Sequence, residues 1–334
     1  MSSFTNLVSV VLPAYNAAQF IRPAINSILN QSYSDLELIV IDDGSTDGTL
    51  EIIKSLQEKD SRIEIISREN RGLVRSLNEG VATARGEFIA RMDADDISDL
   101  DRIKKQIIYI RERGLDLCGT YIRTFGFCLP SLRKYPITSK GANLQLAFNS
   151  CFAHPTIIAR ADILKENPYS ESFQKIEDYE LWTRLALKGY RFGNLPEVLL
   201  NYRRTFSQAT EVYRSTQDAM RIPIALNYAK NQHIFFSSEN LEILLSRNPT
   251  KDNNKLSSAI QYLQNLIIAG YDIEGVLLKN LNISLAYNCT SLNNESWEKL
   301  KVSIPRKIKV ALELIRLMRL HPHSRCWKYM HLLK

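Results

Sequence analysis

Apolar and polar positions follow two alternating patterns over the first 120 residues. Short apolar runs rich in Val and Ile are typical of strands, and segments with an apolar residue every three or four positions are typical of helices. The expected strands cover residues 7–16, 36–41, 62–67, 87–96 and 115–122, and the expected helices cover 18–31, 49–60, 72–86 and 100–114. Strands that alternate with helices pair in parallel through right-handed crossovers, so we predict a doubly wound, Rossmann-like, mostly parallel α/β sheet.

The pattern changes further along the chain. Residues 149–160 and 195–204 have a strand-like pattern, and residues 175–189 have helical spacing. From about residue 210 to residue 334 the spacing is helical throughout. We therefore predict an α/β domain over residues 1–209 and a helical C-terminal extension over residues 210–334.

Composition excludes several classes of protein. The chain has 334 residues, of which 45% are hydrophobic and 24% are charged, as in ordinary globular proteins. It has no apolar run long enough to span a membrane, and its first residues lack the basic start of a signal peptide. Its five cysteines show no CxxC spacing, which favours reduced thiols over disulfides or a zinc site. We expect a cytoplasmic protein.

The positive charge of the chain is concentrated at its end. Residues 301–334 contain nine Lys and Arg against one Glu, whereas the formal net charge of the whole chain is +7. A basic helix with an apolar face suits an anionic membrane surface, and we expect this partner rather than nucleic acid. Attachment to the cytoplasmic face of a membrane would go through this tail. A helix packed on the first domain explains the same pattern equally well.

Acidic residues follow two of the expected strands. Asp42 and Asp43 end the strand 36–41, and Asp93 and Asp95 end the strand 87–96. In doubly wound sheets ligands bind at the carboxyl ends of the strands, so these carboxylates and the Pro13-Ala14-Tyr15 segment predict one shared site. Residues i and i+2 of a strand point to the same side, and paired carboxylates suit Mn²⁺ or Mg²⁺. A solvated acidic loop is the alternative. We expect the remaining acids of this stretch, Asp96, Asp99 and Asp101, to start the next helix.

Several segments in order resemble the sequence blocks of glycosyltransferase family 2. They are "VSVVLPAYNAAQFI", "SYSDLELIVIDDGSTDGTLEII", "ENRGLVRSLNEGVATARGEFIARMDADDIS" and "IEDYELWTRLALKG". The resemblance extends from about residue 7 to residue 210. It implies an inverting, nucleotide-sugar-dependent enzyme of the GT-A fold with a DxD motif. Residues 1–120 would bind the nucleotide sugar, and residues 121–209 would bind the acceptor and supply the base.

The resemblance also implies roles for residues on the donor side. Asp95 would bind Mn²⁺ or Mg²⁺ on the diphosphate, and Asp93 would approach the ribose or the metal. Arg71 would meet phosphate charge, although a solvated loop cation is the alternative for it. The nucleoside would be held by Pro13, Ala14, Tyr15 and Asp43.

On the acceptor side, Asp178 matches the position of the family's general base. Glu177 beside it is the alternative base, and both acids would also favour the start of a helix. His154 and Trp182 are candidates for acceptor contact or site closure, with a place in the core as the alternative for each. Relatives often have His at the position of Thr205, where it contacts the metal or the diphosphate. Arg203 or Arg204 would supply positive charge here instead.

The expected function is a single sugar addition. The donor would be a nucleotide-diphosphate sugar, with UDP as the expected nucleotide, and the acceptor a glycan or a lipid-linked molecule in cell-surface polysaccharide synthesis. A sugar-phosphate nucleotidyltransferase is a rival, but the Gly-rich phosphate loop typical of that class does not follow the first strand. A sugar-nucleotide-binding scaffold without activity is the non-enzyme rival, favoured only by Thr205.

Overall fold

The computed structural model describes residues 6–127, 129–205 and 214–232, together with residues 239 and 298. The predicted basic tail, residues 301–334, lies outside this range, as does most of the predicted helical extension. Contacts divide the chain into two compact units, Met1–Asn143 with Ser150–Gln217, and Leu144–Asn149 with Asp218–Lys334. The predicted domain boundary at residue 209 stays a prediction.

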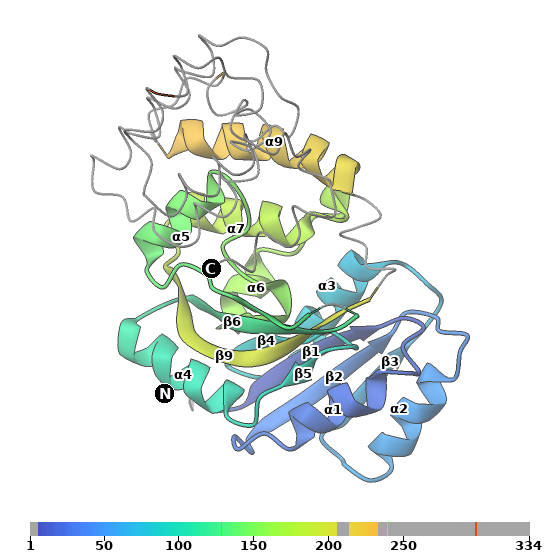
Figure 1. The fold of residues 1–334 in the computed structure, drawn as a ribbon. Helices are drawn as coiled ribbons and strands as arrows, with labels where there is room; N and C mark the ends of the chain where they lie inside the picture. The colour runs from blue at the N-terminus through green and yellow to red at the C-terminus, as the bar shows by residue number, and fades with distance from the viewer. Residues whose placement is uncertain (1–5, 128, 206–213, 233–238, 240–297, 299–334) are drawn as a thin grey trace. The chain divides into compact units, whose positions relative to one another are not determined.

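A single mixed and mostly parallel sheet organises the first unit, with α-helices around it (Figure 1). Its strand order is β3-β2-β1-β4-β8-β6-β9-β5, and β7 pairs with β6 off this path. The strands are β1 (Val8–Ala14), β2 (Leu36–Asp42), β3 (Ile63–Ser67), β4 (Phe88–Arg91), β5 (Ile97–Ser98), β6 (Leu117–Gly126), β7 (Ser131–Arg133), β8 (Ile158–Arg160) and β9 (Phe192–Arg204).

Helices connect the parallel strands as predicted. The α-helices of the described residues are α1 (Ile21–Leu29), α2 (Thr49–Gln57), α3 (Leu73–Thr83), α4 (Arg102–Arg113), α5 (Ser139–Leu146), α6 (Ala161–Glu166), α7 (Glu177–Leu187) and α9 (Arg214–Asn231). Helix α9 belongs to the predicted helical extension. None of these helices is both long and apolar enough to cross a membrane.

The core explains why the first four strands form one layer. Every residue of β1 and β2 is buried, and α1 packs Ile21, Ile25 and Ile28 into the same hydrophobic cluster. Burial of each such side chain contributes about 2 kcal/mol. On the other face, Gly80 of α3 allows the helix to approach the sheet closely, since a Cβ there would lie 2.4 Å from Val11. This packing fixes the carboxyl ends of β1, β2 and β4 at one edge.

The second half of the sheet departs from a purely parallel arrangement. Strand β8 lies between β4 and β6 and is antiparallel to both. The strand-like pattern of residues 149–160 yields only the three residues of β8, because a 3₁₀ turn at His154–Thr156 precedes it. Strands β6 and β9 then pair in parallel over most of their length. The predicted doubly wound sheet is confirmed with these antiparallel additions.

Candidate active site

The loops that follow β1 and β2 form a hydrogen-bonded pair. The Asp43 N–H donates to the Ala14 carbonyl at 2.8 Å, and the Thr46 N–H donates to Asn16 Oδ1 at 2.8 Å. Pro13 and Ala14 are buried, whereas Tyr15 is 54% exposed. The structure thus fixes the backbone at the end of β1 and leaves an aromatic ring accessible beside it.

Asp43 is an anchor for the loop that precedes α3. Its carboxylate accepts hydrogen bonds from the N–H groups of Arg71 (2.8 Å) and Gly72 (3.0 Å) and from the Arg68 guanidinium. A carboxylate has about four acceptor positions, so roughly one is left for a ligand. The Arg71 side chain is half exposed and pairs with Glu69 at 3.1 Å.

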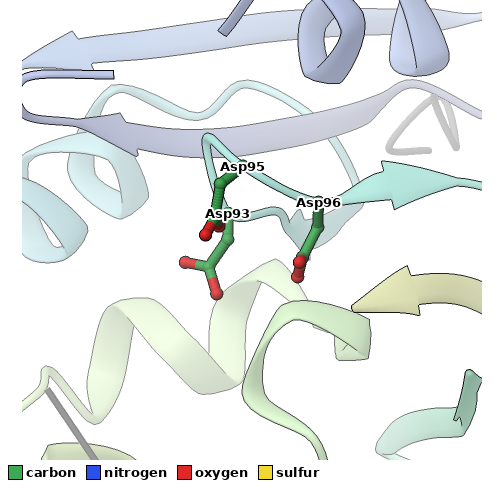
Figure 2. Close-up of side chains that lie close together, drawn as sticks. All are labelled: Asp93, Asp95 and Asp96. Carbon is green, nitrogen blue, oxygen red and sulfur yellow. The ribbon is translucent and has the colours of Figure 1, made fainter. Parts of the chain in front are cut away.

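Three carboxylates gather in the turn that follows β4. Asp93, Asp95 and Asp96 each offer an oxygen within 4.8 Å of the others (Figure 2). Burial and the Asp93 charge raise the pKa of Asp95 to about 6. Burial and the charges of both neighbours raise the pKa of Asp96. Like charges in a poorly solvated place are costly, so this cluster favours protons or a cation.

The helix-capping role that we predict for Asp96 is wrong. Asp96 is fully buried, its Oδ1 accepts from the Arg203 N–H at 2.7 Å, and its Oδ2 has no hydrogen-bond partner among the described residues. The helix starts later, with Asp101 at its N-cap. Asp96 is buried because β5, which follows it directly, pairs with β9. A two-residue strand leaves no periodic signal in the sequence.

Arg91 is a site residue that sequence reasoning missed. It is 5% exposed at the end of β4, and its guanidinium forms a bidentate ion pair with Asp93 at 2.7 Å and 2.5 Å. Its carbonyl accepts from Arg102 at 2.8 Å. A charged residue inside an apolar strand was the available signal, because a buried guanidinium requires a charged partner.

The candidate base lies in the first turn of α7. Burial raises the pKa of Asp178; the Arg91 charge lowers it and the Asp93 charge raises it. Burial and the Asp178 charge raise the pKa of Glu177 to about 7, and Glu177 is 6% exposed. The charges of Arg91 and Asp93 both act on Asp178, so the first turn of α7 lies near the end of β4.

His154 and Trp182 lie in an aromatic cluster next to this site. His154 Nε2 is 3.0 Å from the Tyr169 hydroxyl, and burial followed by the Arg91 charge lowers the His154 pKa well below its usual value. His154 is therefore neutral. Trp182 is fully buried, with its ring 5.9 Å from that of His154. Direct ligand contact by Trp182 does not fit this burial, and its ring supports His154 instead.

Arg203 holds the acidic turn from the side of β9. Its Nε donates to the Asp95 carbonyl at 2.8 Å, and its guanidinium carbon lies 4.5 Å and 4.4 Å from the ring centres of Phe20 and Phe125. The positive charge predicted for Arg203 thus lies beside Asp95. Thr205 follows directly after β9, at the edge of the described range.

Comparison with known proteins identifies the class. Residues 9–167 match the family model described as glycosyl transferase family 2. An uncharacterized glycosyltransferase of Haemophilus influenzae is 34% identical over 226 residues, which is 64% of this chain and 70% of that protein. The O-antigen biosynthesis glycosyltransferase WbnJ of Escherichia coli is 40% identical over 207 residues, 59% of this chain and 80% of WbnJ.

Solved structures agree on the fold. Residues 1–349 of S. aureus TarS in complex with UDP-GlcNAc match with a TM-score of 0.56 at 18% identity, covering 93% of this chain and 87% of that one. The mannosyltransferase PcManGT of Pyrobaculum calidifontis, in complex with GDP-Man and Mn²⁺, matches with a TM-score of 0.52 at 16% identity and covers 96% and 89%. The protein is a glycosyltransferase with the GT-A fold. It belongs to glycosyltransferase family 2.

Proposed function

We propose that this chain is an inverting glycosyltransferase that moves one sugar from a nucleotide-diphosphate sugar, with UDP as the expected nucleotide, to a hydroxyl group. The acceptor would be a glycan or a lipid-linked molecule in cell-surface polysaccharide synthesis. The E. coli relative is named for O-antigen biosynthesis, and a Bacillus subtilis relative, TuaG, for teichuronic acid biosynthesis. The observation that carries the proposal is the carboxylate cluster after β4 together with Asp178.

The cluster fits a divalent cation. Its oxygen ligands are those that Mn²⁺ and Mg²⁺ prefer, and the buried Asp96 Oδ2 lacks a hydrogen-bond partner among the described residues. When Asp93, Asp95 and Asp96 are ionised and Arg91 is positive, a divalent cation balances the net negative charge of these four side chains. A metal held chiefly by Asp95 and Asp93 would stabilise the negative charge of the departing diphosphate as a Lewis acid.

Residues of the first strands would bind the donor. The backbone at Pro13 and Ala14, the exposed Tyr15 ring and the remaining acceptor position of Asp43 would hold the nucleoside. The Arg71 guanidinium would meet a phosphate, and Asp93 the ribose or the metal. Fixed backbone geometry reduces the entropy lost when the nucleotide binds.

Asp178 would take the proton of the attacking hydroxyl group. A carboxylate with a raised pKa is a stronger base, which favours this transfer near neutral pH. The base must face the sugar opposite the leaving group, so it has to be separate from the carboxylates that hold the metal. Neutral His154 would accept a hydrogen bond from the acceptor substrate or donate one to it. Glu177 is the alternative base.

A donor panel and one substitution test the proposal. Purified protein with Mn²⁺ is incubated with UDP-, GDP- and dTDP-sugars, and release of the nucleoside diphosphate is measured. Asp178→Asn should reduce turnover by about 1,000-fold, within the range for loss of a general base, and leave donor affinity within about twofold. Glu171→Gln, which changes an exposed acid of a surface ion pair, is the control. Tight donor binding without turnover for every donor would refute the catalytic proposal, and full activity of Asp178→Asn would refute the assigned base.

A further inference from the structure

The β6–β7 hairpin exposes apolar side chains at its end. Phe127 is 65% exposed, Leu129 is 68% exposed and Leu132 is 48% exposed. Most large apolar residues of the described chain are buried, so three such side chains close together on one hairpin form an exposed patch. Patches of this kind mark surfaces that meet a partner.

The pairing of the two strands separates a buried face from an outward one. Arg123 is paired with Leu132, and Thr124 with Ser131. Paired residues share a face of the sheet, so Arg123 and Leu132 lie on the same face, and the exposed Phe127 follows directly after the end of β6. Thr124 is 1% exposed on the opposite face. The hairpin therefore presents apolar and basic side chains together.

Charge identifies the kind of partner. Residues 117–161 contain no Asp or Glu, and their basic residues are Arg123, Arg133, Lys134, Lys140 and Arg160. Arg123 and Lys134 are exposed beside the apolar patch. We propose that the β6–β7 hairpin docks on an anionic lipid surface, with Phe127, Leu129 and Leu132 entering the headgroup region and Arg123 and Lys134 meeting lipid phosphates. Nucleic acid would bind the basic residues, but it would not explain the two exposed leucines.

The hairpin is joined directly to the acidic turn. Phe125 of β6 stacks on Arg203, whose Nε donates to the Asp95 carbonyl, and the Phe127 N–H donates to the Arg204 carbonyl at 2.9 Å. A docked hairpin would hold the site next to the lipid headgroups. That consequence, delivery of a lipid-linked acceptor, rests on the proposed function, whereas the docking itself does not.

Vesicle sedimentation of the full-length protein tests the docking. Vesicles of phosphatidylcholine alone and of phosphatidylcholine with phosphatidylglycerol are compared, without donor or metal. The protein should bind the anionic vesicles, and Leu129→Ser with Leu132→Ser should reduce binding about tenfold or more, because membrane binding scales with the apolar area buried. Arg123→Gln and Lys134→Gln should each cost about fivefold and weaken the salt dependence. Leu100→Ser, at a residue that is 57% exposed in another loop, is the control and should change nothing.

Four results would overturn the proposal. These are no binding to anionic vesicles, equal binding to neutral vesicles, unchanged binding of the hairpin variants, and a change of oligomeric state in the leucine variant without a change in vesicle binding. The last would assign the patch to a second copy of the chain. Thermal unfolding of each variant checks that it is folded. Donor turnover is measured separately, so an active enzyme that ignores vesicles refutes only the docking, and an inactive one that binds them refutes only the proposed function.

Discussion

The carboxylates at the end of β2 and those after β4 occupy equivalent places in the sheet, but their surroundings are opposite. Asp43 accepts two backbone N–H groups and a guanidinium, and Asp42 accepts from Ser45 N and from Ser67 Oγ. Each of these acids is thus neutralised or solvated by protein donors. Their main role in the fold is to hold loops.

After β4 the carboxylates mostly face one another. Within the described chain, the Arg91 guanidinium forms an ion pair with Asp93, and Asp96 Oδ2 is buried without a partner. The two regions show that an acidic pair at a strand end is not by itself a metal site. The supply of hydrogen-bond donors decides whether its charge is already balanced or needs a cation.

The largest expected effect comes from substituting one carboxylate in each of the two regions and comparing the results. Asp95→Asn should reduce sugar transfer about 1,000-fold or more and abolish measurable Mn²⁺ binding, because a metal's charge stabilisation is worth several kcal/mol. Asp43→Asn should instead lower the free energy of unfolding by about 2–3 kcal/mol, because it removes a buried charge that accepts hydrogen bonds. Calorimetric titration with Mn²⁺ measures metal binding by Asp95→Asn, and urea unfolding measures the stability of Asp43→Asn. Unchanged Mn²⁺ affinity in Asp95→Asn would contradict the difference between the regions.

Removal of Arg91, the positive partner of Asp93, should have the next largest effect. Arg91→Met removes a buried guanidinium and leaves Asp93, which is 27% exposed, beside Asp95 and Asp96 without its partner; it should lower the free energy of unfolding by about 2 kcal/mol at neutral pH, less than for a fully buried pair. Arg62→Met is the matched control, since its ion pair with Asp60 is partly exposed and is worth under about 1 kcal/mol. Equal losses in the two variants, measured by urea unfolding, would show that Arg91 is no more than an ordinary ion-pairing residue.

The pH dependence of the free energy of unfolding should reveal the carboxylate cluster after β4, with an effect of moderate size. The folded pKa of Asp95 is about 6 and its usual value is 3.8, so the folded state binds more protons between these values. The free energy of unfolding should therefore fall as pH rises from about 4 to about 6, by roughly 1–2 kcal/mol. Mn²⁺ should bind more weakly as pH falls through about 6, because protons compete for the carboxylates. Urea unfolding of Asp95→Asn should show a smaller fall, and an identical profile would exclude Asp95 as its source.

The smallest effect concerns Arg71. Its N–H, not its side chain, binds Asp43, so Arg71→Ala should leave the free energy of unfolding within about 0.5 kcal/mol. If the guanidinium meets a donor phosphate, donor affinity should fall by about tenfold, as expected for a partly exposed charge-assisted contact. Donor titration with Mn²⁺ measures this. Wild-type affinity would leave Arg71 as a solvated loop cation.

Local patterns were sufficient for the first half of the sheet. Helix α1 buries Ile21, Ile25 and Ile28 as its spacing predicts, and β1 and β2 are buried on both faces as their continuous apolar runs predict. The sequence pattern did not predict β5, and it predicted a longer strand than β8. They have two and three residues, too few for a periodic signal, and pairing with distant strands decides whether they form.

The sequence by itself determined the class of fold, the edge of the sheet where a site forms and the acids that end β2 and β4, because these follow from neighbouring residues and parallel topology. Only the tertiary structure decided what each acid does. The donors to Asp43 come from 25, 28 and 29 residues away, and the donor to Asp96 from 107 residues away. A carboxylate's charge is set by which groups fold against it, and that information is not local.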